Sequence, residues 1–183
     1  MKKIKETGKY ICWAACTAMA LNKIQPNNQS IDLSARDVYD AVDVNMNNFD
    51  CDYGCSYPDG CIECVKYSYS SFGYTCNNRV STPISGSEMC HYISNQKPVQ
   101  INISTHSDPS ASGSKEHAVI VEKVTLNQNS VVYSIVDPSR KYNPRHEVMV
   151  SVSPAIVSSS FNYTVYDADN STLNYRYWYR TYR

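Results

Sequence analysis

Residues 117–138 have the sequence HAVIVEKVTLNQNSVVYSIVDP, which predicts a β-hairpin. Two apolar stretches rich in β-branched side chains, 117–124 and 131–136, are typical of buried strands. The polar residues 127–130 between them predict the turn, and Asp137-Pro138 ends the second strand because proline cannot donate to a β-ladder.

Strand-like patterns extend from this hairpin in both directions along the chain. Residues 99–103 alternate apolar and polar side chains, as a half-buried strand does, and a loop rich in Ser, Gly and Asp separates them from the hairpin. Three more strands are expected after the hairpin, over 146–152, 161–166 and 173–182. The second half of the chain is therefore expected to form an antiparallel sheet.

The first half has helical patterns. Residues 12–22 are rich in Ala, Leu and Met, which favour helix. Ser34 is a suitable N-cap for a helix over 35–42, and a third helix is expected over 88–95. The segment 65–74 mixes Tyr and Ser without a clear period, and no secondary structure is predicted for it.

Together these patterns predict the α+β class and one domain of 183 residues. A helical half, 1–97, which includes a Cys-rich loop at 51–64, is expected to pack on the β-sheet half, 98–183. Acidic and basic residues balance at 17 each, so the overall charge favours neither a nucleic-acid nor a membrane partner. No apolar run approaches the roughly 20 residues of a membrane span.

The start of the chain resembles a secretory signal, because Met1-Lys-Lys-Ile-Lys5 precedes an apolar stretch over 10–21. The same stretch is better explained as a helix that carries a reactive cysteine, so it is interpreted as part of the folded domain.

Four of the eight cysteines, Cys51, Cys55, Cys61 and Cys64, lie in one turn-rich segment. Disulfides are the preferred interpretation, and they indicate an oxidising compartment and hence a secreted or extracytoplasmic protein. A zinc site made by these four thiolates is the alternative, although the middle spacing is shorter than the roughly 12 to 20 residues of the common two-knuckle pattern. Unpaired thiols in a cytoplasmic or translocated effector domain are the third possibility.

Cys12 is the candidate nucleophile, because it lies where the first helical pattern begins. Unpaired N–H groups and the dipole at a helix N-terminus favour a thiolate, and a neighbouring imidazolium favours it further. Cys16 lies one turn deeper on the same helix and is interpreted as a buried neighbour. A lone cysteine at a helix start is more often structural, so this hypothesis depends on a base elsewhere in the chain.

His117 is the candidate base, since it stands at the start of an apolar strand directly after a polar loop. The hairpin returns Asp137, 20 residues later, to the start of that strand, where its carboxylate can orient the imidazole. Among the other histidines only His106, in the polar loop, is a credible rival base. Asp137 before a proline is also a common turn residue.

The motifs Cys12-Trp-Ala-Ala-Cys16, His117-Ala-Val-Ile-Val and Val136-Asp137-Pro138 resemble those of papain-like cysteine peptidases. They are most similar to the bacterial branch that includes the bacteriocin-processing peptidases, which remove double-glycine leaders. The resemblance spans roughly residues 4–140. It implies a papain-like fold, peptide-bond hydrolysis through a Cys-His-Asp triad and a thioester, a peptide or protein substrate, and no cofactor. The same triad also supports deamidase and transglutaminase chemistry.

One position departs from the family. The resemblance places an oxyanion-stabilising Gln six residues before the nucleophile, where this chain has Glu6. An ionised carboxylate only accepts hydrogen bonds, and losing one oxyanion donor typically slows catalysis about 100- to 1,000-fold. Glu6 therefore keeps open the alternative of a catalytically impaired homologue that acts as a protein-binding module.

The C-terminal segment 175–183 interleaves Tyr and Trp with Arg, a pattern that can stack on nucleic acid. An edge strand with Arg and Tyr on its wet face is the preferred interpretation.

Overall fold

The computed structural model describes residues 12–25, 32–46, 62–76, 79–80, 82–139, 145–166 and 172–182. The predicted α+β class is confirmed. Among the described residues, most of the helices lie in the first half of the chain and most of the strands lie in the second half. The helices are α1 (Cys12–Ile24), α2 (Ala35–Met46), α3 (Ile62–Ser71) and α4 (Gly86–Ser94). The strands are β1 (Arg79–Val80), β2 (Val99–Ser104), β3 (Glu116–Asn127), β4 (Ser130–Val136), β5 (Arg145–Val150), β6 (Ser160–Tyr166) and β7 (Thr172–Tyr182).

The strands form one antiparallel sheet in the order β1-β7-β2-β3-β4-β5, and β6 pairs with β7 outside this path. The predicted hairpin is β3–β4, in which Ile120 pairs with Val136. In the neighbouring pair of strands, His117 lies opposite Ile103 of β2. These registers place the first residues of β3 and the end of β4 at the same end of the sheet.

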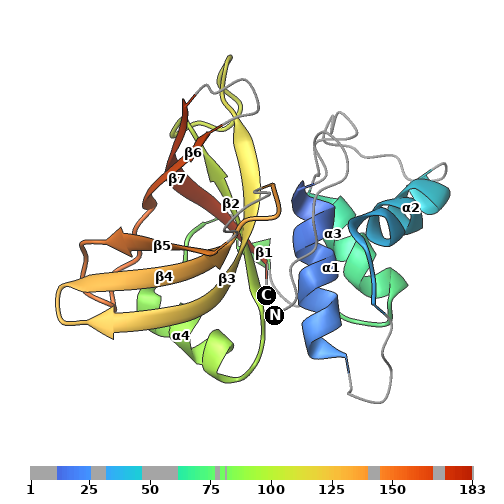
Figure 1. Cartoon of the computed structure of the whole chain (residues 1–183), viewed down its shortest axis with the longest axis horizontal. Helices are drawn as coiled ribbons and strands as arrows, with labels where there is room; N and C mark the ends of the chain where they lie inside the picture. The colour runs from blue at the N-terminus through green and yellow to red at the C-terminus, as the bar shows by residue number, and fades with distance from the viewer. Residues whose placement is uncertain are drawn as a thin grey trace.

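Helix α1 is the element that joins the helices to the sheet. Figure 1 shows it between β3 on one side and α2 and α3 on the other. Every residue from Trp13 to Leu21 is buried, so this helix is apolar on all sides rather than amphipathic. The Thr17 hydroxyl, whose Oγ1 lies 3.1 Å from Oε1 of Gln100, links α1 to β2. The first of two hydrophobic cores forms around α1.

The second core lies within the sheet half, where α4 packs against β3 and β2. Figure 1 shows the sheet curling away from α1, α2 and α3, with α4 below it in the view. Helix α4 approaches β4 closely at Gly86, where an added Cβ would lie 2.5 Å from Cγ2 of Val131. Ser85 caps this helix by accepting a hydrogen bond from the Glu88 amide.

Two details differ from the sequence-based expectations. The segment 65–74, for which nothing was predicted, contributes most of α3. Its apolar residues Val65 and Tyr69 are buried against α1, so tertiary packing stabilises a helix that Tyr and Ser propensities do not favour.

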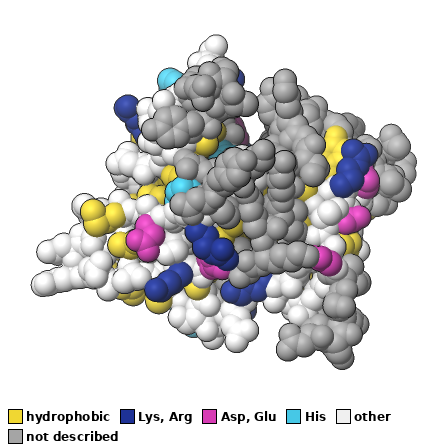
Figure 2. Space-filling model, viewed as in Figure 1, with side chains coloured by type: hydrophobic (Ala, Val, Ile, Leu, Met, Phe, Trp, Pro, Cys, Tyr) yellow, Lys and Arg dark blue, Asp and Glu magenta, His cyan; other side chains and the backbone are white. Residues whose placement is uncertain are grey.

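The prediction of an edge strand at the C-terminus was wrong. Strand β7 pairs with β2 on one side and with β1 and β6 on the other. Its side chains Tyr175, Trp178 and Tyr182 are buried and belong to the core, whereas Tyr177 and Tyr179 are half-buried. Among the described side chains on the face in Figure 2, basic and acidic groups are interspersed. None of the described helices is long and apolar enough to cross a membrane.

Candidate active site

The candidate nucleophile Cys12 is the first residue of α1. Its side chain is half-buried and its thiol is free, whereas the following residues of the helix are buried. Backbone N–H groups in the first turn of a helix have no intrahelical acceptor and carry a partial positive charge. The thiol therefore lies at a helix end that favours a negative charge.

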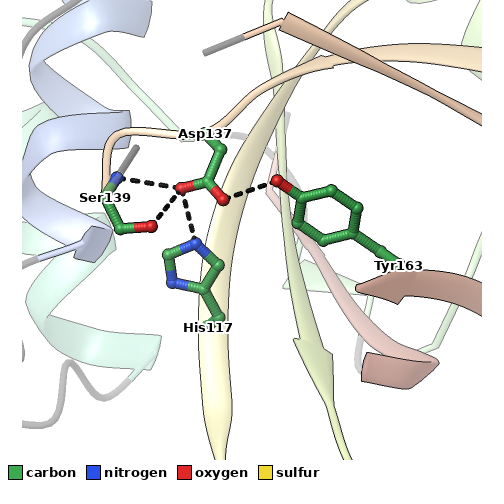
Figure 3. A network of polar contacts seen from close by, with 4 residues as sticks. All are labelled: His117, Asp137, Ser139 and Tyr163. Carbon is green, nitrogen blue, oxygen red and sulfur yellow. Dashed lines mark hydrogen bonds and ion pairs between the residues drawn. The ribbon is translucent and has the colours of Figure 1, made fainter. Parts of the chain in front are cut away.

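His117 and Asp137 meet at the end of the β3–β4 hairpin. Nε2 of His117 lies 2.8 Å from Oδ1 of Asp137, and the two side chains are 8% and 0% exposed (Figure 3). An ionised carboxylate has no proton to give, so Nε2–H of His117 is the donor. This bond fixes the tautomer of the neutral ring and leaves Nδ1 as the nitrogen that can accept a proton.

Asp137 is held by further donors from two directions. Its Oδ1 also accepts hydrogen bonds from the Ser139 amide at 2.8 Å and the Ser139 hydroxyl at 2.7 Å. Its Oδ2 accepts a hydrogen bond of 2.6 Å from the Tyr163 hydroxyl, which reaches the site from β6 (Figure 3). A buried carboxylate needs such donors, because burial without them would favour its neutral form.

Cys12 completes the arrangement, because its thiol lies close enough to His117 to contribute to the raised pKa of the ring. Since Nε2 faces Asp137, Nδ1 is the ring nitrogen that remains for the thiol. The structure thus brings together the three residues that the sequence singled out, from the start of α1, the start of β3 and the end of β4. A thiol, an imidazole and a buried carboxylate in this order can pass the thiol proton to the ring and generate a thiolate.

The electrostatics of the pair favour an ionised carboxylate beside a protonated ring. Burial lowers the pKa of His117, but the charge and hydrogen bond of Asp137, together with the contact from Cys12, outweigh burial and raise this pKa well above its ordinary value. Burial raises the pKa of Asp137, but His117, Tyr163 and Ser139 outweigh it and hold this pKa far below its usual range.

These shifts predict how stability depends on pH. The lowered pKa of Asp137 gives stability that is present above the unfolded value of about 3.9 and is lost as the pH falls. The raised pKa of His117 gives stability that is present below the unfolded value of about 6.5 and is lost as the pH rises through the folded value. The contribution of the pair is therefore largest between about pH 4 and 6.5.

Denaturant unfolding of the wild type and Asp137→Ala at pH 3, 5 and 9 measures this contribution. The free energy of unfolding is expected to be higher in the wild type than in the variant. This difference is expected to be largest at pH 5 and smaller at pH 3 and pH 9. Glu147→Gln, at an exposed carboxylate of β5, serves as the control and is expected to show no such maximum. A difference that does not vary with pH would contradict an ionic pair.

Other candidate residues lie apart from this site or outside the described chain. His106 is exposed in the loop between β2 and β3, so burial does not support it as the rival base. Cys16 is buried in α1, as expected of a structural neighbour. Glu6 falls outside the described residues, and so do three of the clustered cysteines: Cys51, Cys55 and Cys61.

The fourth clustered cysteine, Cys64, is buried in α3. Within the described ranges, no group of three or more His, Cys, Asp or Glu side chains is arranged to hold a metal ion. The choice between disulfides and zinc depends on the three cysteines outside those ranges, so the expected oxidising compartment stays a prediction.

Two residues of the site were not identified from the sequence. Ser139 follows Asp137-Pro138 in a turn, where an Asp side chain often accepts from the backbone N–H two residues on, so local turn chemistry could have indicated it. Tyr163 lies 26 residues beyond Asp137 on a different strand, and only the fold brings it there.

No model of a known protein family matches the chain, and a search of curated proteins found no match.

Proposed function

We propose that this chain is a papain-like thiol peptidase that hydrolyses peptide bonds. Cys12 is the nucleophile, His117 is the general base and acid, and Asp137 orients the imidazole. The observation that carries the proposal is the buried His117–Asp137 pair, with the Cys12 thiol close enough to contribute to the raised pKa of the His117 ring. The free thiol at a helix N-terminus supports the first role, and the raised pKa of His117 supports the second.

The topology also supports the papain-like assignment. The nucleophile lies on a helix of the first half, whereas the base and its orienting carboxylate lie on a sheet of the second half, in the chain order Cys, His, Asp. The two catalytic groups therefore meet where the halves pack together.

Acylation forms one bond and breaks another at the substrate carbonyl. His117 takes the thiol proton at Nδ1, and the Cys12 thiolate attacks the carbonyl carbon to give a tetrahedral oxyanion. The oxyanion collapses, the C–N bond breaks, and His117 returns its proton to the leaving amine. The product is a thioester between the acyl half of the substrate and Cys12.

Deacylation repeats these steps with water as the nucleophile. His117 removes a proton from water, the hydroxide attacks the thioester carbon, and the C–S bond breaks to release a carboxylic acid and the thiolate. Throughout, Asp137 holds the ring in one tautomer and stabilises its charged form. The Cys12 backbone N–H, at the start of α1, supplies part of the oxyanion hole.

A peptide pool analysed by mass spectrometry tests this function. The wild type is expected to convert peptides into pairs of fragments that together gain one water, and Cys12→Ala is expected to lose this activity. Cys90→Ala is the matched control, because Cys90 is a half-exposed free thiol on α4. Cys90→Ala is expected to cleave at the wild-type rate.

Each other outcome has a distinct meaning. Peptides that gain about one mass unit without cleavage would indicate deamidation by the same triad, and cross-linked peptides would indicate transglutamination. Cleavage that persists in Cys12→Ala would overturn the assignment of the nucleophile. A wild type that leaves the pool unchanged would overturn the peptidase proposal in favour of a binding module.

A further inference from the structure

The Tyr163 hydroxyl bonds the carboxylate oxygen of Asp137 that His117 does not contact. The hydroxyl donates a 2.6 Å hydrogen bond to Oδ2, whereas His117 and Ser139 both bond Oδ1 (Figure 3). The Tyr163 side chain is only 5% exposed, so water does not compete freely for this bond. A short hydrogen bond to an ionised carboxylate is roughly twice as strong as one between neutral groups.

The sheet fixes the ring of Tyr163 as well as its hydroxyl. Tyr163 pairs with Tyr175 across β6 and β7, and the His146 ring of β5 lies 5.6 Å from it, centroid to centroid. The Tyr175 ring in turn lies 5.5 Å from the ring of His117. The triad and the titratable rings described beside it come from α1, from four strands and from the residue after β4: Cys12, His117, Asp137, His146, Tyr163 and Tyr175.

We infer that Tyr163 is a positioning residue of the site, which acts through Asp137 by fixing the carboxylate and, with it, the orientation of the His117 ring. The inference rests on the proposed function, because it concerns the same nucleophile and base. The four hydrogen bonds described above converge on the two oxygens of Asp137, and one orientation of the carboxylate plane satisfies all four. Without the Tyr163 hydroxyl, Oδ2 loses a buried donor, and the carboxylate is free to turn away from His117.

The test compares two tyrosine hydroxyls of the same core. Tyr163→Phe removes the bond to Asp137. Tyr133→Phe removes a hydroxyl from a ring that packs on Phe161 and Trp178 instead. The readout is the second-order rate constant for alkylation of Cys12 by iodoacetamide at neutral pH, which needs no knowledge of the substrate. Tyr163→Phe is expected to slow alkylation about tenfold, and Tyr133→Phe less than about twofold.

A double-mutant cycle separates action through Asp137 from a general loss of stability. Tyr163→Phe is expected to lower the denaturant midpoint of the wild type and to leave the midpoint of Asp137→Ala unchanged, since the acceptor is already gone. Tyr133→Phe is expected to shift both backgrounds equally.

Three results would count against the inference. Alkylation of Tyr163→Phe at the wild-type rate, or equal midpoint shifts in both backgrounds, would overturn it and leave the proposed function intact. A wild-type Cys12 that reacts no faster than the thiol of His117→Ala would overturn the proposed function, and the inference with it.

Discussion

Replacing His117 by alanine is expected to lower kcat/KM for peptide hydrolysis by about a million-fold, as for the loss of a triad base. The thiol of Cys12 then has no proton acceptor, and the leaving amine has no donor. Steady-state kinetics on the best substrate from the peptide pool measures the loss. Binding is expected to persist, because His117 acts on the reacting atoms rather than on the rest of the substrate.

The matched control is His91→Ala, because His91 is an exposed histidine on α4. It is expected to leave kcat/KM within about twofold of the wild type, as surface substitutions usually do. A loss below tenfold in His117→Ala, with the fold intact by circular dichroism, would contradict the assignment of the base.

Replacing Asp137 by alanine is expected to lower kcat/KM by about 1,000- to 10,000-fold. The imidazole loses the partner that fixes its tautomer and stabilises its charge, and the donors from Ser139 and Tyr163 lose their acceptor. Unpaired buried donors cost about 1–3 kcal/mol each, so the free energy of unfolding is expected to fall as well. Kinetics and denaturant unfolding of the same preparation measure both effects.

Two comparisons make this result specific. Asp137→Asn keeps an oxygen that can accept from His117, as the amide of Cys-His-Asn triads does, and is expected to lose less activity than Asp137→Ala. Asp108→Ala removes an exposed loop carboxylate that bonds Ser110, and it is expected to have no effect on kcat/KM. Equal losses in Asp137→Ala and Asp137→Asn would mean that the carboxylate acts by its charge alone.

Much of the architecture could be predicted from the sequence, because the decisive signals were local. The Ala-rich stretch after Cys12 and the two apolar runs around 127–130 specify α1 and the β3–β4 hairpin by period and turn chemistry alone. The hairpin also placed Asp137 near His117, since a two-stranded ladder of known length returns the chain to a known position.

The remaining features depend on contacts between distant segments. Helix α3 has weak helical propensity and is stabilised by the burial of Val65 and Tyr69. The internal position of β7 follows from its pairing with β2 and β6, which no local pattern encodes. Tyr163 reaches Asp137 only because β6 pairs with β7 and lies beside β5, so nothing in its own neighbourhood marks it as part of the site.

The central claim is that His117 activates one thiol, that of Cys12. It is tested most directly by treating the non-reduced protein at neutral pH with an epoxysuccinyl inhibitor of thiol proteases, followed by intact mass and peptide mapping. We predict one adduct on Cys12 in the wild type and none in His117→Ala, with the free thiol of Cys90 unlabelled in both. No adduct in the wild type, or adducts on several cysteines whether or not His117 is present, would contradict the account.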